Sequence, residues 1–197
     1  MNIAFVYLLL ERDKLRSEFV KNVTSKYSQF KIEKAIDWQD DNQIKNIKQK
    51  LNDLNINLKT DRDPDLISDI KEKNIKKAKL AIYGSYIHLL EKYMNYDYLV
   101  VLQDDTYFEN DFFESIDNII KSGYIDENIN SARLGQYLSG AIFKKNFYKI
   151  FINQLKKYGI VRPLDHCLVG LSPCEQIMKD FLERIVFVQK YKSNISD

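Results

Sequence analysis

The chain has 197 residues and a mass of 23.3 kDa, a length that fits one domain (residues 1–197) with a proper hydrophobic core. Thirty basic side chains against twenty-eight acidic ones leave a net charge of +2, which argues against a dedicated nucleic-acid-binding protein with its dense positive surface. Hydrophobic residues make up 45% of the sequence, so the composition predicts a folded chain.

The N-terminal segment predicts a strand, a helix and a second strand. Residues 3–10 form a continuous apolar run, typical of a strand covered on both faces; no basic stretch precedes it and no small-residue cleavage site follows, which argues against a signal peptide. Residues 30–37 alternate as a second strand. Between them, four apolar residues recur at helical spacing: Leu15, Phe19, Val20 and Val23. This order favours an α/β domain with a mostly parallel central sheet flanked by helices.

Residues 39–77 are rich in Asn, Lys and Asp, with a break at Pro64, and we expect a polar, variable insertion of solvated helices and loops. The lysines between Lys71 and Lys79 could contact an anionic membrane or glycolipid surface peripherally, although a solvated helix face is the favoured interpretation. No segment reaches the roughly 18–20 apolar residues of a membrane-spanning helix, so we expect a soluble, cytoplasmic protein. Cys167 and Cys174 are expected to be free thiols, as suits a reducing compartment.

The remaining elements follow in order. A helix with five inward-facing residues (Leu80, Tyr83, Ile87, Leu90 and Tyr93) leads into a strand that ends at Gln103. A helix capped by Asn110 or Asp111 then runs to about Gly123. A short strand at 136–142 precedes a helix that ends at Gly159 and faces the core with Phe147, Ile150, Phe151 and Leu155. A turn, a helical stretch and a last strand at 185–189 close the chain.

Two adjacent acids, Asp104 and Asp105, stand directly after the most strand-like segment of the chain. Because strand side chains alternate, Gln103 and Asp105 should point one way and Asp104 the other. Oxygen ligands two residues apart can converge on Mg²⁺ or Mn²⁺, and such an ion can bridge a diphosphate. Ligands of open α/β sheets bind beyond the carboxyl ends of strands, so this position suits a nucleotide-sugar site. The alternative is a turn that leads into a helix cap.

Several short motifs in the same order resemble glycosyltransferase family 25, the lipooligosaccharide and collagen-type sugar transferases. The family's Leu-x-Arg … Arg start is similar to "LERDKLR", and its Ala-Val-Asp-Gly turn is similar to "AIDW" at residues 35–38. Its Ser-His helix before Glu-Asp-Asp resembles "SYIHLLEKY", which contains His88, followed by "LVVLQDD". Its Gly-x-Tyr-Ala-Tyr, Pro-x-Asp-His and C-terminal motifs resemble "GQYLSGAIF", "RPLDHCL" and "VQKYKSNISD". The resemblance spans nearly the whole chain.

The resemblance implies a GT-A-like, Rossmann-like fold and transfer of a hexose, with galactose as one candidate, from a UDP-sugar to a glycan or glycolipid hydroxyl. It implies Mn²⁺ or Mg²⁺ as cofactor, held by Asp105 with Gln103 and His166, while Asp104 reaches the donor's ribose or sugar. It also implies an inverting reaction with Asp165 as the base. The oligomeric state stays open.

Each candidate residue has a structural alternative. Arg12 and Arg16 suit nucleotide phosphates or ordinary charge on a helix surface, and Asp165 suits a base or a helix N-cap. His166 next to a helix start is more often structural, and His88 is expected to be a satisfied core histidine.

Two departures from the family pattern favour a second hypothesis. Gln103 replaces the family's Glu, which keeps a ligating oxygen but removes one negative charge, and the family's Gly-Glu before the Ser-His helix is missing, with Ala81 at the Glu position. A weakened or inactive relative that acts as a binding or scaffold protein is therefore the alternative. A phosphatase of the haloacid dehalogenase type is disfavoured, because its Asp-x-Asp-x-Thr motif follows the first strand.

Overall fold

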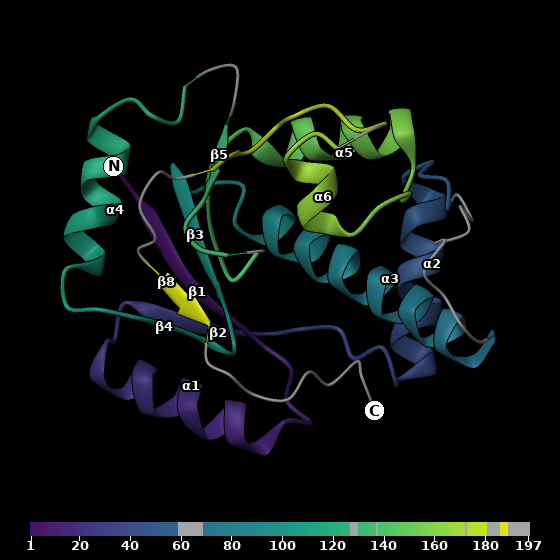
Figure 1. Cartoon of the computed structure of the whole chain (residues 1–197), viewed down its shortest axis with the longest axis horizontal. Coiled ribbons are helices and arrows are strands. Elements are labelled where there is room, and N and C mark those ends of the chain that lie inside the picture. Colours follow the sequence, from purple (N-terminus) through teal and green to yellow (C-terminus); the bar gives the residue numbers. More distant parts are fainter. Residues whose placement is uncertain (59–68, 127–129, 137, 172, 181–185, 189–197) are drawn as a thin grey trace.

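The computed structural model describes residues 1–58, 69–126, 130–136, 138–171, 173–180 and 186–188. A central sheet lies between two helical layers (Figure 1). In chain order the elements are β1 (Ile3–Leu9), α1 (Lys14–Lys26), β2 (Phe30–Lys34), α2 (Asp41–Asp53), α3 (Asp69–Lys92), β3 (Tyr98–Gln103), β4 (Thr106–Phe108), α4 (Phe112–Lys121), β5 (Ser131–Arg133), β6 (Gly140–Lys144), α5 (Phe147–Tyr158), α6 (Leu164–Leu168), β7 (Lys179–Asp180) and β8 (Val186–Val188).

The main sheet has six strands in the order β2-β1-β3-β6-β5-β7. β1 pairs in parallel with both β2 and β3, β6 runs antiparallel to its neighbours β3 and β5, and β7 pairs in parallel with β5. The predicted mostly parallel α/β sheet is therefore confirmed. A separate antiparallel pair is formed by β4 and β8.

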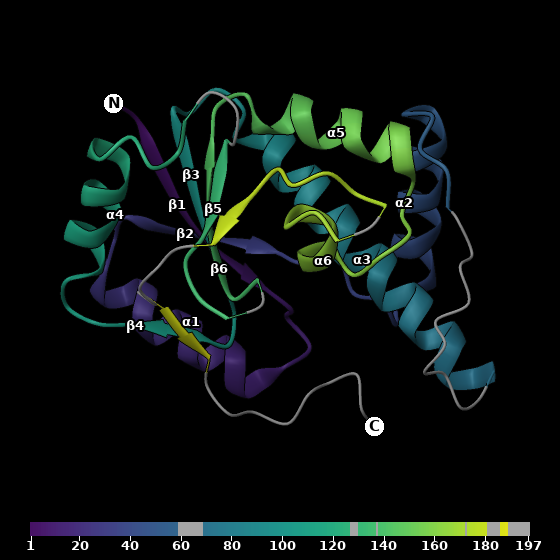
Figure 2. The same cartoon turned by 45° about the horizontal axis from the view of Figure 1, so that its top comes forward.

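Each face of the sheet covers its own hydrophobic core. On one face, α1 and α4 pack over a core that includes Tyr7, Phe30 and Phe112. On the other face, α2, α3, α5 and α6 pack over a larger core that includes Val6, Tyr83 and Phe143 (Figure 2). β1 and β3 are continuous apolar runs, and helices cover both of their faces. For β1, this arrangement was predicted from the apolar run.

Most of the predicted elements are confirmed, and two details are corrected. Leu15 was expected to face the core, but it is 66% exposed, because α1 begins only at Lys14 and packs through its later turns. The short strand expected at 136–142 lies at Gly140–Lys144. The predicted last strand is present as β8, and it pairs with β4.

The segment expected to be a solvated insertion contributes to the core where the structure describes it. α2 buries Ile44, Ile47 and Leu51 against α3 and is part of the larger core, while Pro64 lies outside the described residues. The cysteines are free and buried, as expected. Within the described ranges no helix is both long and apolar enough to span a membrane.

Gly84 lets α2 and α3 approach closely. A Cβ atom at this position would lie 2.5 Å from Ile47 Cδ1 and 2.9 Å from Ile36 Cδ1. We predict that Gly84→Ala lowers the free energy of unfolding by about 1–3 kcal/mol, because overpacking outweighs the better helix propensity of alanine. Denaturant unfolding measures this difference.

The double variant Gly84→Ala, Ile47→Ala supplies the control. It should lose less stability than the sum of the two single changes, since it removes the side chain that the new methyl group meets. Strict additivity would contradict the close approach.

Candidate functional site

The chain turns sharply where β3 ends, and buried hydrogen bonds hold this turn. The Gln103 backbone N–H donates to the Ser139 carbonyl at 2.9 Å, and the Thr106 hydroxyl donates to the same carbonyl at 2.8 Å. The Tyr7 hydroxyl donates to the Thr106 carbonyl at 2.9 Å. The two acids between Gln103 and Thr106 therefore start from a fixed backbone.

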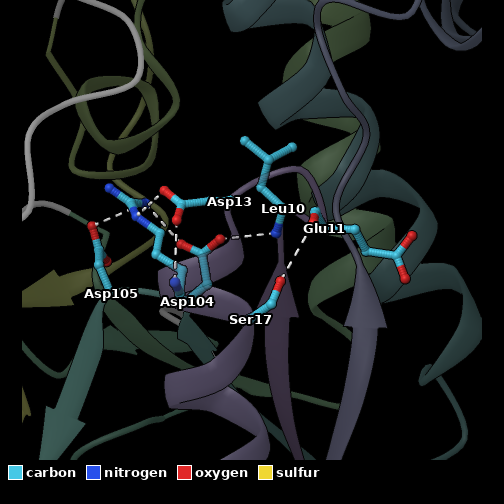
Figure 3. A network of polar contacts seen from close by, with 7 residues as sticks. Leu10, Glu11, Asp13, Ser17, Asp104 and Asp105 are labelled. Atoms are coloured by element: carbon cyan, nitrogen blue, oxygen red, sulfur yellow. Dashed lines mark hydrogen bonds and ion pairs between the residues drawn. The ribbon is translucent and has the colours of Figure 1, made fainter.

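Asp104 is buried, and both of its carboxylate oxygens have partners. One oxygen accepts the Leu10 backbone N–H at 2.8 Å, and the other accepts Arg16 Nη1 at 2.8 Å. Leu10 immediately follows β1, so Asp104 fastens the end of β3 to the end of its parallel neighbour (Figure 3). In this conformation Asp104 is a structural anchor.

The Arg16 guanidinium lies among three carboxylates. Besides Asp104, it is 3.4 Å from Asp105 Oδ2 and 3.3 Å from Asp13 Oδ2. Asp13 is also the N-cap of α1, where it accepts the Arg16 backbone N–H at 3.1 Å. Figure 3 shows Asp13, Asp104 and Asp105 turned toward one another around this guanidinium. Both acids of the pair therefore contact the same cation, although strand alternation predicted opposite directions, because the strand ends at Gln103.

Burial and charge oppose each other in this cluster. Burial raises the pKa of both Asp104 and Asp105, and the nearby Arg16 charge offsets only part of that effect. Burial lowers the pKa of Arg16, but the charges of Asp104 and Asp105 outweigh burial and raise it. The cluster thus keeps a permanent cation beside two carboxyl groups that are harder to ionise than usual.

Asp105 has one oxygen to offer. Its Oδ1 atom is buried and has no hydrogen-bond partner among the residues that the structure describes. Mg²⁺ sites commonly take one or two protein carboxylates and fill the remaining positions with substrate phosphates and waters. Asp105 Oδ1 is therefore the one carboxylate oxygen of the pair without a protein partner among the described residues. No group of three or more His, Cys, Asp and Glu side chains in the described ranges could hold a metal by itself.

A pocket of about 440 Å³ opens at the carboxyl ends of β1 and β2. Four parts of the chain form its wall: the segment after β1, the end of β2 with the segment that follows it, α2, and α3. The lining residues are Leu10, Glu11, Arg12, Lys34, Ala35, Ile36, Asp37, Gln43, Asn46, Ile47, Lys50 and His88. Leu10 belongs both to this pocket and to the Asp104 anchor. The volume lies within the usual range of small-molecule sites.

Arg12 is held at the pocket wall by two contacts. Its Nη1 atom is 2.7 Å from Asp37 Oδ1, and its guanidinium carbon lies 4.9 Å from the centroid of the Trp38 ring. Asp37 is fixed in turn, because its backbone N–H donates to Gln43 Oε1 at 2.9 Å. The "AIDW" turn thereby positions a cation at the pocket.

His88 is not a core histidine. Its side chain is exposed and lines the pocket, whereas its neighbours Ile87 and Leu89 are buried. The apolar residues beside it in the sequence face other sides of α3, which explains why the sequence-based expectation was wrong.

Asp165 and His166 lie on α6, on the same face of the sheet as α3. Asp165 is mostly buried, while the His166 side chain is 47% exposed and lies 3.9 Å from Asp165. The N-cap of α6 is Pro163, so the N-cap alternative for Asp165 is wrong by two residues.

The buried Tyr86 hydroxyl links α6 to the acid pair. Burial raises the pKa of Tyr86, a side-chain contact with Gln103 lowers it, and the negative charges of Asp105 and Asp165 raise it further, so both carboxylates lie within electrostatic range of one hydroxyl group. Its oxygen makes no hydrogen bond of ordinary geometry to the described residues. Tyr86 is therefore under the electrostatic influence of both the acid pair and α6.

Sequence reasoning missed Asp13, Trp38 and Tyr86. Asp13 carried a usable signal, because an Asp directly before a helix is a typical N-cap. Trp38 and Tyr86 carried none, since their roles arise from contacts between elements.

No protein-family model matches the sequence, and a search of curated proteins also finds no match. Among solved structures, the chain is similar to the crystal structure of a glycosyltransferase involved in the glycosylation of the major capsid of PBCV-1. That similarity has 14% sequence identity and a TM-score of 0.39, and it covers 91% of this chain and 82% of the other.

The raised pKa of Asp105 predicts a specific pH dependence of stability. A carboxyl group whose pKa is higher in the folded state than in the unfolded state stabilises the fold below its unfolded pKa of about 4, and this stabilisation is lost as the pH rises through the folded pKa. The free energy of unfolding of the wild type should therefore fall relative to Asp105→Asn between acid and neutral pH, by about 1.4 kcal/mol for each unit of pKa elevation.

Asp40 provides a control of opposite sign. Hydrogen bonds from the Gln43 backbone and side chain lower its pKa, so its stabilisation is present at neutral pH and lost in acid. Asp40→Asn keeps an N-cap residue on α2 and should give the reverse slope in the same urea unfolding series. Equal slopes for the two variants would contradict the burial of Asp105.

Proposed function

We propose that this protein is a glycosyltransferase that moves a hexose from a nucleotide-sugar donor to a hydroxyl group of a glycan or glycoconjugate. The proposal depends on one observation: the pocket at the ends of β1 and β2 adjoins the carboxylate pair at the end of β3 through Leu10. A nucleotide in the pocket would have its diphosphate directed toward Asp105, at the sheet edge where α/β proteins bind such ligands.

The charges of the site suit a diphosphate. Arg12 lines the pocket with a planar donor group, and Asp105 Oδ1 together with Gln103 could hold Mn²⁺ or Mg²⁺. When bound, the ion would neutralise charge that develops on the leaving diphosphate. Arg16 would act indirectly in this proposal, because it holds Asp105 in place through an ion pair.

Asp165 is the proposed base. It would accept the proton of the acceptor hydroxyl as that oxygen bonds to the anomeric carbon and the bond from this carbon to the diphosphate oxygen breaks. Attack opposite the leaving group would invert the anomeric centre. The charges of Asp105 and Asp165 both raise the pKa of the buried Tyr86 hydroxyl, which supports a base on α6 within electrostatic range of the acid pair. UDP-galactose is the donor that we would test first.

A non-catalytic binding or scaffold protein is the second candidate. The observation that favours it is the commitment of Asp104 to Leu10 and Arg16, which leaves one carboxylate oxygen and the neutral Gln103 amide for a metal. These two oxygen ligands would be sufficient for a pocket that binds a nucleotide without transferring a sugar.

A donor panel tests catalysis. We expect the wild type, with Mn²⁺, to transfer or hydrolyse at least one nucleotide sugar, and Asp165→Asn to reduce the rate by about 10²–10⁴-fold because general base catalysis is lost. Asp105→Ala should reduce metal-dependent nucleotide binding, measured by isothermal titration.

The matched control is Asp117→Asn, which removes a half-exposed carboxylate on α4 that pairs only loosely with Lys121 at 3.7 Å. It should leave rate and affinity unchanged. Absence of both transfer and hydrolysis across the panel would sink the catalytic proposal and leave the binding protein as the remaining candidate.

Restoring the acidic residue separates the two candidates. We predict that Gln103→Glu strengthens the metal site by adding a negative ligand and raises Mn²⁺-dependent donor hydrolysis several-fold, if the chain is a weakened enzyme. Hydrolysis is measured by release of the nucleotide diphosphate, with Gln136→Glu as a control for added charge on the β5–β6 connection. An unchanged rate in Gln103→Glu would favour the scaffold.

A further inference from the structure

Trp38 occupies a position that the nucleotide-sugar proposal does not use. It follows Asp37 in the connection between β2 and α2, is half-buried, and packs against the larger core. The Arg12 guanidinium lies over this ring, at 4.9 Å from the centroid. A core-anchored ring is a rigid platform, and cation–π contacts of this kind stabilise one orientation of a long flexible side chain.

The two contacts of Arg12 leave one of its donor groups without a partner. Nη1 is occupied by Asp37 at 2.7 Å, while Nη2 is buried and makes no hydrogen bond to any residue that the structure describes. A buried guanidinium nitrogen without an acceptor is costly, so it indicates either an ordered water or a bound ligand. Arg12 lines the 440 Å³ pocket, where such an acceptor could be supplied.

We propose that Trp38 is a positioning residue that, together with Asp37, holds Arg12 so that Nη2 donates a hydrogen bond to an oxygen of the nucleotide in the pocket. This inference rests on the proposed nucleotide site but not on sugar transfer. Arg12 is the contacting residue, and Trp38 acts through it by restricting the guanidinium to one plane. The geometry needs arginine, because lysine has no second nitrogen to offer once it pairs with Asp37.

The chain contains a single tryptophan, and this gives a direct measurement. Trp38 emission, excited at the red edge of its absorption where nucleotides are transparent, should change and saturate on titration with UDP. Uridine and pyrophosphate are the other two probes. A response to uridine assigns the acceptor to the base or ribose, a response to pyrophosphate assigns it to a phosphate oxygen, and no response to any probe overturns the proposal.

Variants separate positioning from simple packing. By isothermal titration, Trp38→Leu should bind UDP about 3- to 30-fold more weakly, which is the range of a cation–π contact converted to affinity. Trp38→Phe keeps an aromatic face and should recover most of that loss, and Arg12→Lys should bind at least about 10-fold more weakly because it loses the fork. Wild-type affinity in Arg12→Lys would overturn the proposal even if Trp38→Leu failed to fold.

Tyr96→Leu is the matched control. It removes a comparable contact, in which Lys31 Nζ lies 5.4 Å from the Tyr96 ring, at the opposite end of β2 from the pocket. UDP affinity should stay at the wild-type value in this variant, and an equal loss would mean that general destabilisation explains the Trp38 result.

The outcomes also separate this inference from the proposed function. UDP binding that depends on Arg12 and Trp38, with no transfer from any donor, would support the inference and reject catalysis. Sugar transfer with the same KM in wild type, Trp38→Leu and Arg12→Lys would support catalysis and reject the inference.

Discussion

The ion cluster around Arg16 is the interaction on which the site depends. Two adjacent carboxylates at the end of a buried strand would repel each other and lose solvation, and the guanidinium offsets part of both effects by contacting Asp104 at 2.8 Å and Asp105 at 3.4 Å. Because Arg16 sits in the first turn of α1, which Asp13 caps, the same cluster fixes the start of that helix relative to the end of β3.

Strand order brings this cluster and the pocket together. β1 lies between β2 and β3, and all three run in parallel, so their carboxyl ends meet at one edge of the sheet. The acid pair follows β3, the pocket opens beyond β1 and β2, and Leu10 belongs to both. This arrangement suits a ligand with a ring system that fills the pocket and an anionic group that reaches the acid pair. A nucleotide sugar is such a ligand, and a nucleotide-binding scaffold would use the same surface.

Much of the candidate site could be predicted because its residues follow predicted strands. Gln103, Asp104, Asp105 and the two arginines were singled out by their places after strands together with the resemblance to a known family, and they lie at the carboxyl ends of β1 and β3. The different roles of the two acids were not predictable. Asp104 accepts a hydrogen bond from Leu10, which is 94 residues away in the sequence, while Asp105 keeps a buried oxygen without a partner among the described residues. The expectation for His88 was wrong. The residues next to it on α3 are apolar, and such a sequence does not reveal that this one position faces a cavity.

The sequence by itself determined the elements with strong periodicity: β1, β3, the later turns of α1, the buried face of α3, and α5 with its end at Gly159. These depend on local spacing of apolar residues, which the chain carries wherever it folds. Only the tertiary structure decided that α2 joins the core, that the last strand pairs with β4, and that Trp38 lies under Arg12. Those features depend on which elements become neighbours, and the contacts that select neighbours join residues far apart in the chain.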